Sequence, residues 1–422
     1  MKDKILGFVR TKTVYQTAVT TGTTIINGIL GILFYIYLAR SLGPAQFGIF
    51  SVAVLSLALI ADIATVGTDT GIVKFVGKYL QSDKEKALRF LKLGLKTKII
   101  VGTMLIIAGW FLVPFIAEKL LYKPELTVYL RYSLIGAFGG MIFTFTTSAI
   151  QAVQKFWAWG ILNISLNALR LATILILAAS LILNADLALV SYIVFPFIGF
   201  FAGLAILPGF LKVKNENSVS KEFFNYNKWV AVFTLIAAVS SRLDTYISAR
   251  FLSLTEVGIY SVAVNLAGVV PQLVFAIAVV AAPKLSSFDT DAKAKAYLKK
   301  LQVLVLALGF AGLAVGIPLA YALIPGIYGS IYSPSIYPFI ILLAAQAIFL
   351  ISVPVHTAVI YYFGYPRLFV YISVVNLAAI AAGGYFLIGS YGMIGAAIAV
   401  LIGNTLNFII PAVWVVRKFA KK

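Results

Sequence analysis

The amino-acid sequence predicts an all-α integral membrane protein with twelve transmembrane helices, arranged as two parallel-repeat lobes of six helices each. Three observations lead to this prediction. Hydrophobic residues make up 61% of the chain and charged residues only 11%, whereas about 25% of the residues of a soluble globular protein are charged. The apolar residues come in blocks of about 20, the length of a helix that crosses the hydrocarbon core of a bilayer. A stretch of the first half also recurs in the second half.

The apolar blocks are separated by mostly short connections. Closed β-barrels, the other structures that span membranes, would give alternating strands of about ten residues, and this pattern is absent. The apolar run after the opening MKDKILGFVR is too long for a signal peptide and lacks a clear cleavage site, so it is assigned to the first span. The predicted spans are 14–38, 47–70, 99–117, 132–153, 158–183, 187–210, 229–252, 257–282, 301–325, 338–362, 368–388 and 392–416.

Basic residues divide unequally between the two sides of this arrangement. Of the 34 Lys and Arg residues, 27 fall on the side of both termini, eight of these within 71–98, and 5 fall on the opposite side. Because short loops rich in Lys and Arg stay in the cytoplasm, the sequence predicts a multi-pass protein of the cell membrane with both termini cytoplasmic. These loops and anionic lipid headgroups account for the net charge of +20, so nucleic acid is not an expected partner.

The connection 71–98 is expected to be helical in two pieces. The stretch GIVKFVGKYL places Lys74 and Lys78 four residues apart among apolar residues, as in a helix that lies at a membrane interface. Ser82 is followed three residues later by Glu85, which is the pattern of a capping box. We therefore expect a helix break near Ser82.

One stretch of sixteen residues occurs twice. ARSLGPAQFGIFSVAV at 39–54 and ARFLSLTEVGIYSVAV at 249–264 lie 210 positions apart and share nine identical residues. The offset maps the first two spans onto the seventh and eighth, and six is an even number, so both halves keep the same orientation. Transporters built from such parallel repeats bind their substrate between the halves. The predicted domains are a six-helix lobe 1–210, a cytoplasmic linker 211–228 and a six-helix lobe 229–422.

The repeated stretches also resemble a known family. LARSLGPAQFGIFSVAV followed by GTDTGIVKFVGKY is similar to the opening of prokaryotic polysaccharide transporters, which are lipid-linked oligosaccharide flippases of the multidrug/oligosaccharidyl-lipid/polysaccharide flippase superfamily. RLDTYISARFLSLTEVGIYSVAV and IYGSIYSPSIYPFIILLAAQAIF in the second half resemble the same family. The resemblance implies the fold of multidrug and toxin extrusion (MATE) transporters, with spans 1, 2, 7 and 8 around a central cavity and transport by alternating access.

The resemblance implies that the chain moves a lipid-linked oligosaccharide across the cytoplasmic membrane, for the biosynthesis of a surface polysaccharide or glycan. The implied partners are membrane lipids, a polyprenyl-(pyro)phosphate-linked sugar and the enzymes that assemble the glycan. An ion-coupled multidrug or cation antiporter of the same fold is the alternative, and it would use buried carboxylates such as Asp62 and Asp244. A membrane glycosyltransferase or polymerase is less favoured, because the external loops are short and nearly free of carboxylates.

No enzyme activity is expected from the sequence. It has no phosphate-cradling glycine loop and no cluster of metal-ligand residues, and it has no cysteine that could act as a nucleophile or bind a metal. We therefore expect no catalytic residues, no metal site and no cofactor.

Ionisable residues within the predicted spans are candidate functional residues, because a charge at bilayer depth costs about 2.5–3.5 kcal/mol on insertion scales. Arg242 and Asp244 lie in span 7 and, being two residues apart, do not share a helix face. Arg242 is expected either to bind a substrate phosphate, which a guanidinium group holds by two hydrogen bonds, or to close a structural ion pair. The candidates for ion coupling or for a structural role are Asp62, Asp69, Arg170 and His356.

For three of these four candidates an explanation other than ion coupling is favoured. Arg170 is expected to have a partner in the first lobe, with Asp62 as the candidate. Asp69 lies near the end of span 2 and is expected to be solvated there. His356 is the single histidine, and it is expected to be a packed residue more readily than a proton carrier.

Polar residues on spans 1 and 8 complete the candidate binding residues. Thr17, Thr20, Thr24 and Asn27 follow helical spacing and form one stripe, which either packs against another helix or forms a sugar-binding wall of the cavity. Asn265 and Gln272 lie seven residues apart on one face of span 8, where Pro271 is expected to kink the helix. The candidate substrate-binding residues are Arg242, Asp244, Thr20, Thr24, Asn27, Asn265 and Gln272.

Two arginines are equivalent by the repeat. Arg40 and Arg250 flank the external ends of spans 1 and 7. They are expected either to extend to the membrane interface or to form an external gate.

Overall fold

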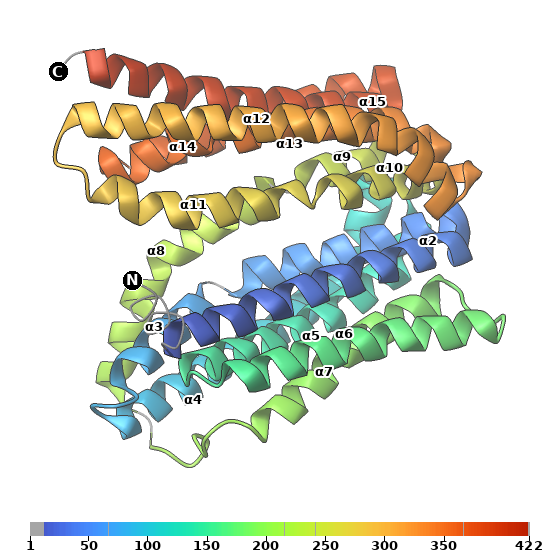
Figure 1. Ribbon diagram of the computed structural model, residues 1–422. Coiled ribbons are helices and arrows are strands. Elements are labelled where there is room, and N and C mark those ends of the chain that lie inside the picture. Colours follow the sequence, from blue (N-terminus) through green and yellow to red (C-terminus); the bar gives the residue numbers. More distant parts are fainter. Residues whose placement is uncertain (1–11, 66, 215, 241, 366, 421–422) are drawn as a thin grey trace. The chain divides into compact units, whose positions relative to one another are not determined.

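The computed structural model describes residues 12–420 except 66, 215, 241 and 366 (Figure 1). Among these residues, nine helices are long and apolar enough to cross a membrane. The chain divides into two compact units, the first comprising Met1–Leu42 and Ala53–Ala238 and the second Gly43–Val52 and Val239–Lys422. The predicted all-helical membrane class is therefore confirmed.

The elements up to α8 belong to the first unit, apart from the middle of α2 and the end of α8. They comprise long helices joined by short turns of π- or 3-10 helix. In order, they are α2 (Lys12–Thr65), α3 (Thr68–Tyr79), α4 (Lys84–Phe115), η1 (Ile116–Leu120), η2 (Pro124–Leu126), α5 (Thr127–Ala152), α6 (Phe156–Ala179), α7 (Ala185–Leu204) and α8 (Asn217–Ser240).

The elements from α9 onward form the second unit together with residues 43–52. In order, they are α9 (Leu243–Phe251), α10 (Leu254–Ala267), α11 (Val270–Ser286), α12 (Asp291–Leu323), η3 (Ile324–Tyr328), η4 (Ser330–Ser335), α13 (Ile336–Ile351), α14 (Val353–Thr357), η5 (Ala358–Tyr362) and α15 (Arg367–Ala420).

The same sequence of element types occurs in both units. A long helix with a proline inside it, α4 with Pro114 or α12 with Pro318, continues into a π-helical turn and then a 3-10 turn before the next helix. The two π-helical turns, η1 and η3, lie 208 positions apart, close to the offset of the repeated stretch. The repeat seen in the sequence is therefore also a repeat of local structure.

The two copies of the repeated stretch bend by different means. In the first copy Gly43 has a φ of 70° and a ψ of 169° and interrupts α2, and Pro44 follows it. Glycine accepts this positive φ without a steric cost, and proline suits the first turn of the helix that follows. In the second copy Ser253 caps α10: its hydroxyl accepts from the backbone N–H of Glu256 at 3.2 Å, and its own N–H donates to the Glu256 carboxylate at 2.9 Å.

Two glycines shared by the copies lie in close backbone contact inside the second unit. A Cβ atom added at Gly48 would overlap the carbonyl oxygen of Leu254, and one added at Gly258 would overlap the carbonyl oxygen of Pro44. Only a residue without a side chain allows this approach. The shared glycines of the repeat are thus explained by packing.

The connection 71–98 is not a loop. It consists of α3 and the first half of α4, with a break at residues 80–83. The expected break is confirmed, but the expected N-cap Ser82 is wrong. Asp83 caps α4 instead, because its side chain accepts from the backbone N–H of Lys86 at 2.9 Å. Glu85 does not complete a capping box and pairs with Arg89 at 2.6 Å.

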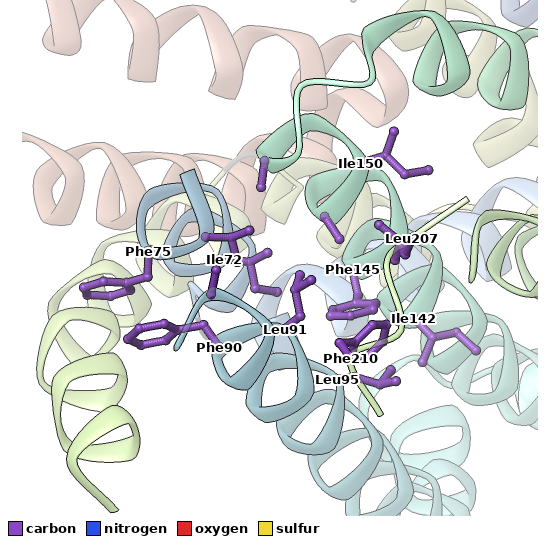
Figure 2. Close-up of a cluster of buried hydrophobic side chains, with 14 of the residues drawn as sticks. Ile72, Phe75, Phe90, Leu91, Leu95, Ile142, Phe145, Ile150, Leu207 and Phe210 are labelled. Carbon is purple, nitrogen blue, oxygen red and sulfur yellow. The ribbon is translucent and has the colours of Figure 1, made fainter. Parts of the chain in front are cut away.

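An aromatic and aliphatic cluster holds α3 inside the first unit (Figure 2). The rings of Phe75 in α3 and Phe90 in α4 stack with centroids 4.7 Å apart. Ile72 of α3 is fully buried in the same cluster, to which α5 contributes Phe145. α3 is thus a packed helix of this unit, with one face exposed at Lys74 and Lys78.

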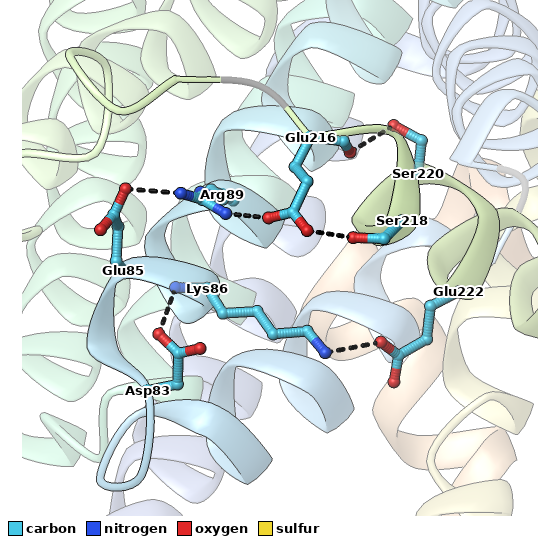
Figure 3. Close-up of polar contacts among 8 residues, drawn as sticks. All are labelled: Asp83, Glu85, Lys86, Arg89, Glu216, Ser218, Ser220 and Glu222. Carbon is cyan, nitrogen blue, oxygen red and sulfur yellow. Dashed lines mark hydrogen bonds and ion pairs between the residues drawn. The ribbon is translucent and has the colours of Figure 1, made fainter.

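The segment expected to be a linker contacts α4 through charged groups (Figure 3) and α3 through the Tyr79 hydroxyl. Lys86 lies 3.1 Å from the Glu222 carboxylate, and the Tyr79 hydroxyl donates to the same carboxylate at 2.9 Å. Arg89 pairs with Glu216. Residues at the start of α8 are therefore fixed to the first unit.

This contact gives the start of α8 a pH dependence. Partial burial by itself would raise the pKa of Glu222, but the hydrogen bonds from Lys86 and Tyr79 and the charges of Lys86 and Lys78 outweigh it and hold this pKa below its ordinary value. A carboxylate with a lowered pKa stabilises the fold above its ordinary pKa of about 4.3, and this contribution is lost as the pH falls through the lowered pKa.

The Glu222→Gln variant should therefore unfold at a lower temperature than the wild-type chain at pH 6–7, and the difference should shrink below about pH 4.3 as the pH falls through the lowered pKa of Glu222. Thermal unfolding of both proteins in detergent across this pH range measures it. Glu118→Gln, a change at an exposed carboxylate of η1, is the control and should show no such difference. A Glu222→Gln difference that persists unchanged at pH 3 would contradict the linkage.

Candidate functional site

Arg242 stands at a break between two helices. α8 ends at Ser240 and α9 begins at Leu243, so the predicted span 229–252 is divided between two helices. Arg242 is the N-cap of α9, with a φ of −132° and a ψ of 1°. Serines precede it, and serine hydroxyls compete with the backbone for hydrogen bonds and favour helix ends. The half-buried Arg242 therefore lies at the N-terminal end of a helix.

Asp244, in the first turn of α9, is held by a tyrosine of α10. Its carboxylate accepts from the Tyr260 hydroxyl at 2.9 Å and lies 3.5 Å from the Thr245 hydroxyl. Asp244 is 9% exposed, and Tyr260 is fully buried. Within the described part of the chain, the buried hydroxyl of Ser248, one turn further along α9, has no hydrogen-bond partner. This group combines a buried carboxylate with an unused hydroxyl.

Arg170 is the centre of a polar network in the first unit. Its guanidinium group donates to the Asn167 side chain and to the Tyr192 carbonyl, each at 3.5 Å, and lies 4.1 Å from the centre of the Tyr192 ring. Asn167 in turn donates to Asn27 at 2.8 Å. The network joins α2, α6 and α7, and it gives Arg170 partners other than the expected Asp62.

The network leaves one donor unused. The Arg170 Nε is buried and has no hydrogen-bond partner among the residues that the structure describes. A buried donor of this kind usually marks local strain or the binding of an ion or a water molecule. Arg170 therefore keeps capacity to bind an anion.

Three residues of these two groups were not anticipated from the sequence. Asn167 and Tyr192 complete the network of Arg170, and Tyr260 binds Asp244. Asn163, Asn167 and Arg170 follow helical spacing, so a search for polar stripes in span 5 would have found Asn167. Tyr260 stands where the first copy of the repeat has Phe50, and the added hydroxyl is the signal there.

The threonine stripe of span 1 is mostly satisfied within its own helix. Thr20 donates to the Gln16 carbonyl at 3.1 Å and Thr24 to the Thr20 carbonyl at 2.9 Å. Thr24 is exposed, and Asn27 reaches α6. The side chain of Thr17 lies outside the described residues. The stripe thus combines helix contact at Asn27 with exposed hydroxyls at Thr24.

The expected kink at Pro271 is confirmed, because α10 ends at Ala267 and α11 begins at Val270. Asn265 is half-buried and Gln272 is exposed. The break places them on different helices, so the seven-residue spacing does not put them on one helix face.

Asp69 is not a solvated end residue. It forms an ion pair with Lys98 at 2.5 Å, and the Lys98 side chain is fully buried. Lys98 also donates to the Met141 carbonyl at 2.9 Å and to the Thr144 hydroxyl at 2.8 Å. The ion pair joins α3, α4 and α5. Lys98 was counted among the basic residues of the connection 71–98, but it is a buried residue of α4.

The Asp69→Asn variant should lose about 3–5 kcal/mol of stability, because it leaves the buried Lys98 ammonium group without its counter-charge. Lys98→Met should cost less, since Asp69 keeps 23% side-chain exposure and water can solvate it. The double variant Asp69→Asn/Lys98→Met should recover most of the loss. Thermal unfolding of the wild-type protein and the three variants measures the order of their stabilities. Equal losses in both single variants without recovery in the double variant would contradict a buried ion pair.

The remaining candidates are placed as follows. The Nε2 atom of His356 donates to the Asn407 carbonyl at 2.9 Å, and the imidazole ring lies against Phe349 and Phe369. Arg250 lies 5.7 Å from the centre of the Phe251 ring. Arg40 and Asp62 are both exposed side chains of α2. Among the described residues, no three His, Asp or Glu side chains are grouped as metal ligands.

Comparison with known families identifies the chain. The family described as polysaccharide biosynthesis protein matches residues 14–289, which is more than half of its length. The chain belongs to the polysaccharide biosynthesis protein family. No curated protein sequence matches this member of the family.

Solved structures show the fold of this polysaccharide biosynthesis family member. An inward-facing multidrug resistance MATE family transporter of the MOP superfamily is similar with a TM-score of 0.76 and 14% identity, over 93% of this chain and 95% of the other. The lipid II flippase MurJ in an inward closed conformation has a TM-score of 0.72 and 15% identity, over 97% and 89%. A MOP superfamily transporter from Pyrococcus furiosus has a TM-score of 0.56 and 14% identity, over 96% and 94%. The chain therefore has the MATE-like fold.

Proposed function

We propose that the protein is a flippase that moves a lipid-linked oligosaccharide across the cytoplasmic membrane by alternating access. The observation that carries the proposal is the match to the polysaccharide biosynthesis family over residues 14–289, on a chain with a transporter fold. A transporter needed for polysaccharide biosynthesis must move a glycan precursor. The similar fold of a lipid II flippase supports a lipid-linked one.

The intramembrane cations suit such a cargo. A lipid-linked sugar carries a phosphate or pyrophosphate, which loses hydration inside the membrane at a cost of several kcal/mol unless a cation pairs with it. Arg242 at the start of α9 combines a guanidinium group with the positive end of a helix, and both favour phosphate. We propose that Arg242 binds the (pyro)phosphate, with Asp244 nearby. Arg170, with its unused Nε, is a second candidate for the same class of ligand.

The polar residues without charge are proposed to contact the sugar. Thr24 and Gln272 are exposed, and Asn265 is half-buried. Hydroxyl and amide groups are the usual partners of a sugar's hydroxyls. Thr20 and Asn27 are proposed to hold α2 in place around Thr24 through their hydrogen bonds.

An ion-coupled multidrug or cation antiporter is the second candidate. The observation that favours it is the buried carboxylate of Asp244 beside Tyr260, together with the fold of a MATE transporter. The Pyrococcus furiosus transporter is described as having a binding pocket of reverse polarity and a different function. This fold thus carries pockets of more than one charge, and the arginines favour an anionic cargo here.

Reconstituted protein separates the two candidates. The purified chain in vesicles should accelerate the movement of a polyprenyl-pyrophosphate-linked oligosaccharide between leaflets. It should not accumulate a cationic dye under a proton or sodium gradient. Dye accumulation without glycolipid movement would replace the flippase by the antiporter.

The topology is proposed to have twelve spans with both termini in the cytoplasm. This count divides α2 at Gly43 and α15 at Gly392, which has a φ of 57°, and takes α8 and α9 as one span. Reporter fusions after residues 90, 220, 290 and 420 should report the cytoplasm. Fusions near 43, 186 and 330 should report the outside. A single fusion in this set that reports the opposite side of the membrane would contradict the twelve-span arrangement.

A further inference from the structure

A cavity of about 240 Å³ lies in the second unit, at the end where α12 begins and α15 ends. We call it the α12–α15 pocket. α12 contributes Lys295, Leu298, Lys299 and Gln302 to its lining. α14 and α15 contribute the rest, which is apolar. None of the proposed substrate-binding residues lies in this lining.

The inner wall of the α12–α15 pocket is hydrocarbon. Pro354 of α14 and Val415 of α15 are buried. Leu298, Val355 and Phe419 are partly buried beside them. No aspartate or glutamate belongs to the lining. Contact with an alkyl chain removes this apolar wall from water, which is favourable. The wall has few hydrogen-bonding groups for a sugar.

The rim of the α12–α15 pocket carries two positive charges. Lys295 and Lys299 are one turn apart on the same face of α12, and both are exposed. Lys295 donates to the Phe419 carbonyl at 3.3 Å, which fixes its ammonium group at the end of α15. Lys299 has no hydrogen bond and no ion pair within the part of the chain that the structure describes. Asp291, one turn earlier, accepts a hydrogen bond from Tyr362.

Aromatic residues next to the α12–α15 pocket are of the kind found at membrane–water interfaces. Tyr365 stacks on Trp414 with centroids 5.5 Å apart, and Lys418 lies 5.3 Å from the centre of the Trp414 ring. Tryptophan and tyrosine prefer the depth of the lipid headgroups. The rim lysines at this end of the unit therefore lie where a lipid phosphate is within reach.

We propose that the α12–α15 pocket binds an anionic phospholipid of the surrounding bilayer. The phosphate lies against Lys295 and Lys299, and the upper part of one acyl chain covers Pro354 and Val415. Basic pockets between transmembrane helices are known to hold anionic headgroups in this way. The volume lies below the roughly 300–1,000 Å³ that enclose a drug-sized ligand, so it fits part of an elongated molecule. A free phosphate would leave the apolar wall uncovered.

A lipid bound here contacts three helices of the second unit at once. Because a ligand that binds only the folded state stabilises it, phosphatidylglycerol should raise the unfolding temperature of the purified protein more than phosphatidylcholine does. Native mass spectrometry in detergent should show tighter binding of phosphatidylglycerol than of phosphatidylcholine.

The test compares two double variants that remove the same charge from α12. Lys295→Gln/Lys299→Gln should weaken phosphatidylglycerol binding at least fivefold and abolish the lipid-dependent rise in unfolding temperature. Lys293→Gln/Lys300→Gln changes exposed lysines outside the lining and should leave both unchanged. Val415→Phe narrows the apolar wall while keeping both charges, and it should also weaken binding.

Several outcomes would overturn the proposal. Equal losses in the two double variants would assign the effect to net charge. Equal binding of phosphatidylcholine would remove the role of the anionic headgroup. A preference of the Lys295/Lys299 site for undecaprenyl phosphate over phosphatidylglycerol would assign the pocket to the sugar carrier instead of to the bilayer. If the double variant Lys295→Gln/Lys299→Gln does not unfold cooperatively, the single variant Lys299→Gln takes its place. The proposal then requires that this single variant also loses phosphatidylglycerol binding.

Discussion

Replacing Gly258 by valine should remove nearly all folded protein from the membrane. A Cβ atom at this position would overlap the carbonyl oxygen of Pro44, and it would also lie 2.9 Å from the backbone nitrogen of Gly48. These are backbone atoms of a neighbouring segment, so no side-chain rotation can relieve the overlap. Helices approach this closely only where both carry small residues. The segments must move apart, and their packing in the second unit is lost.

Gly258→Ala tests the size of the effect. It adds a single methyl group and should already lower the unfolding temperature and the yield of monodisperse protein. Gly312→Val is the matched control, because nothing lies within 4 Å of a Cβ atom at this glycine of α12. Fluorescence-detected size-exclusion chromatography of the variants measures the yield. A normal yield of Gly258→Val would show that the close contact of the repeated glycines is dispensable.

The sequence was sufficient for the class of fold because the repeat and the hydropathy are strong signals. Gly48 and Gly258 were visible as shared residues, and the structure gives the reason in their backbone contact. Pro271 was visible as a kink because proline lacks an N–H group and cannot continue a helix without a break. Local chemistry of this kind can be seen without knowing which segments meet.

Residues whose role depends on distant partners could not be assigned. Lys98 was counted among the solvated basic residues of the connection 71–98, since a lysine after a basic run is normally solvated. Its burial depends on Asp69 and on acceptors from α5, 43 and 46 positions away. A hydropathy pattern also does not show a helix break when the residues on both sides of it are apolar. The break before Arg242 was therefore not predicted.

The choice between two capping residues failed for a related reason. Ser82 and Asp83 are adjacent, and either could accept the bond from a backbone N–H of the first turn. The turn that ends α3 decides between them: the N–H of Asp83 donates to the Tyr79 carbonyl at 2.8 Å. Only the path of the chain shows this.

The Arg242→Gln variant should reduce glycan export about ten- to hundredfold while the protein still folds. A charge-assisted hydrogen bond contributes about 1.5–3 kcal/mol, and each 1.4 kcal/mol corresponds to a factor of ten. Glutamine keeps a polar side chain at the N-cap of α9, but it is shorter than arginine and cannot neutralise a phosphate. Lysine keeps the charge without the planar fork, so Arg242→Lys should retain part of the export.

Restoration of surface glycan in a strain that lacks the transporter measures export, and the amount of monodisperse protein measures folding. Arg417→Gln is the control, because it makes the same change at an exposed arginine in the last turn of α15. A structural ion pair predicts a different pattern, in which Arg242→Gln lowers the amount of folded protein and export falls in proportion. Full export by a folded Arg242→Gln protein would remove Arg242 from the proposed phosphate site and leave Arg170, with its unused buried donor, as the cation to test next.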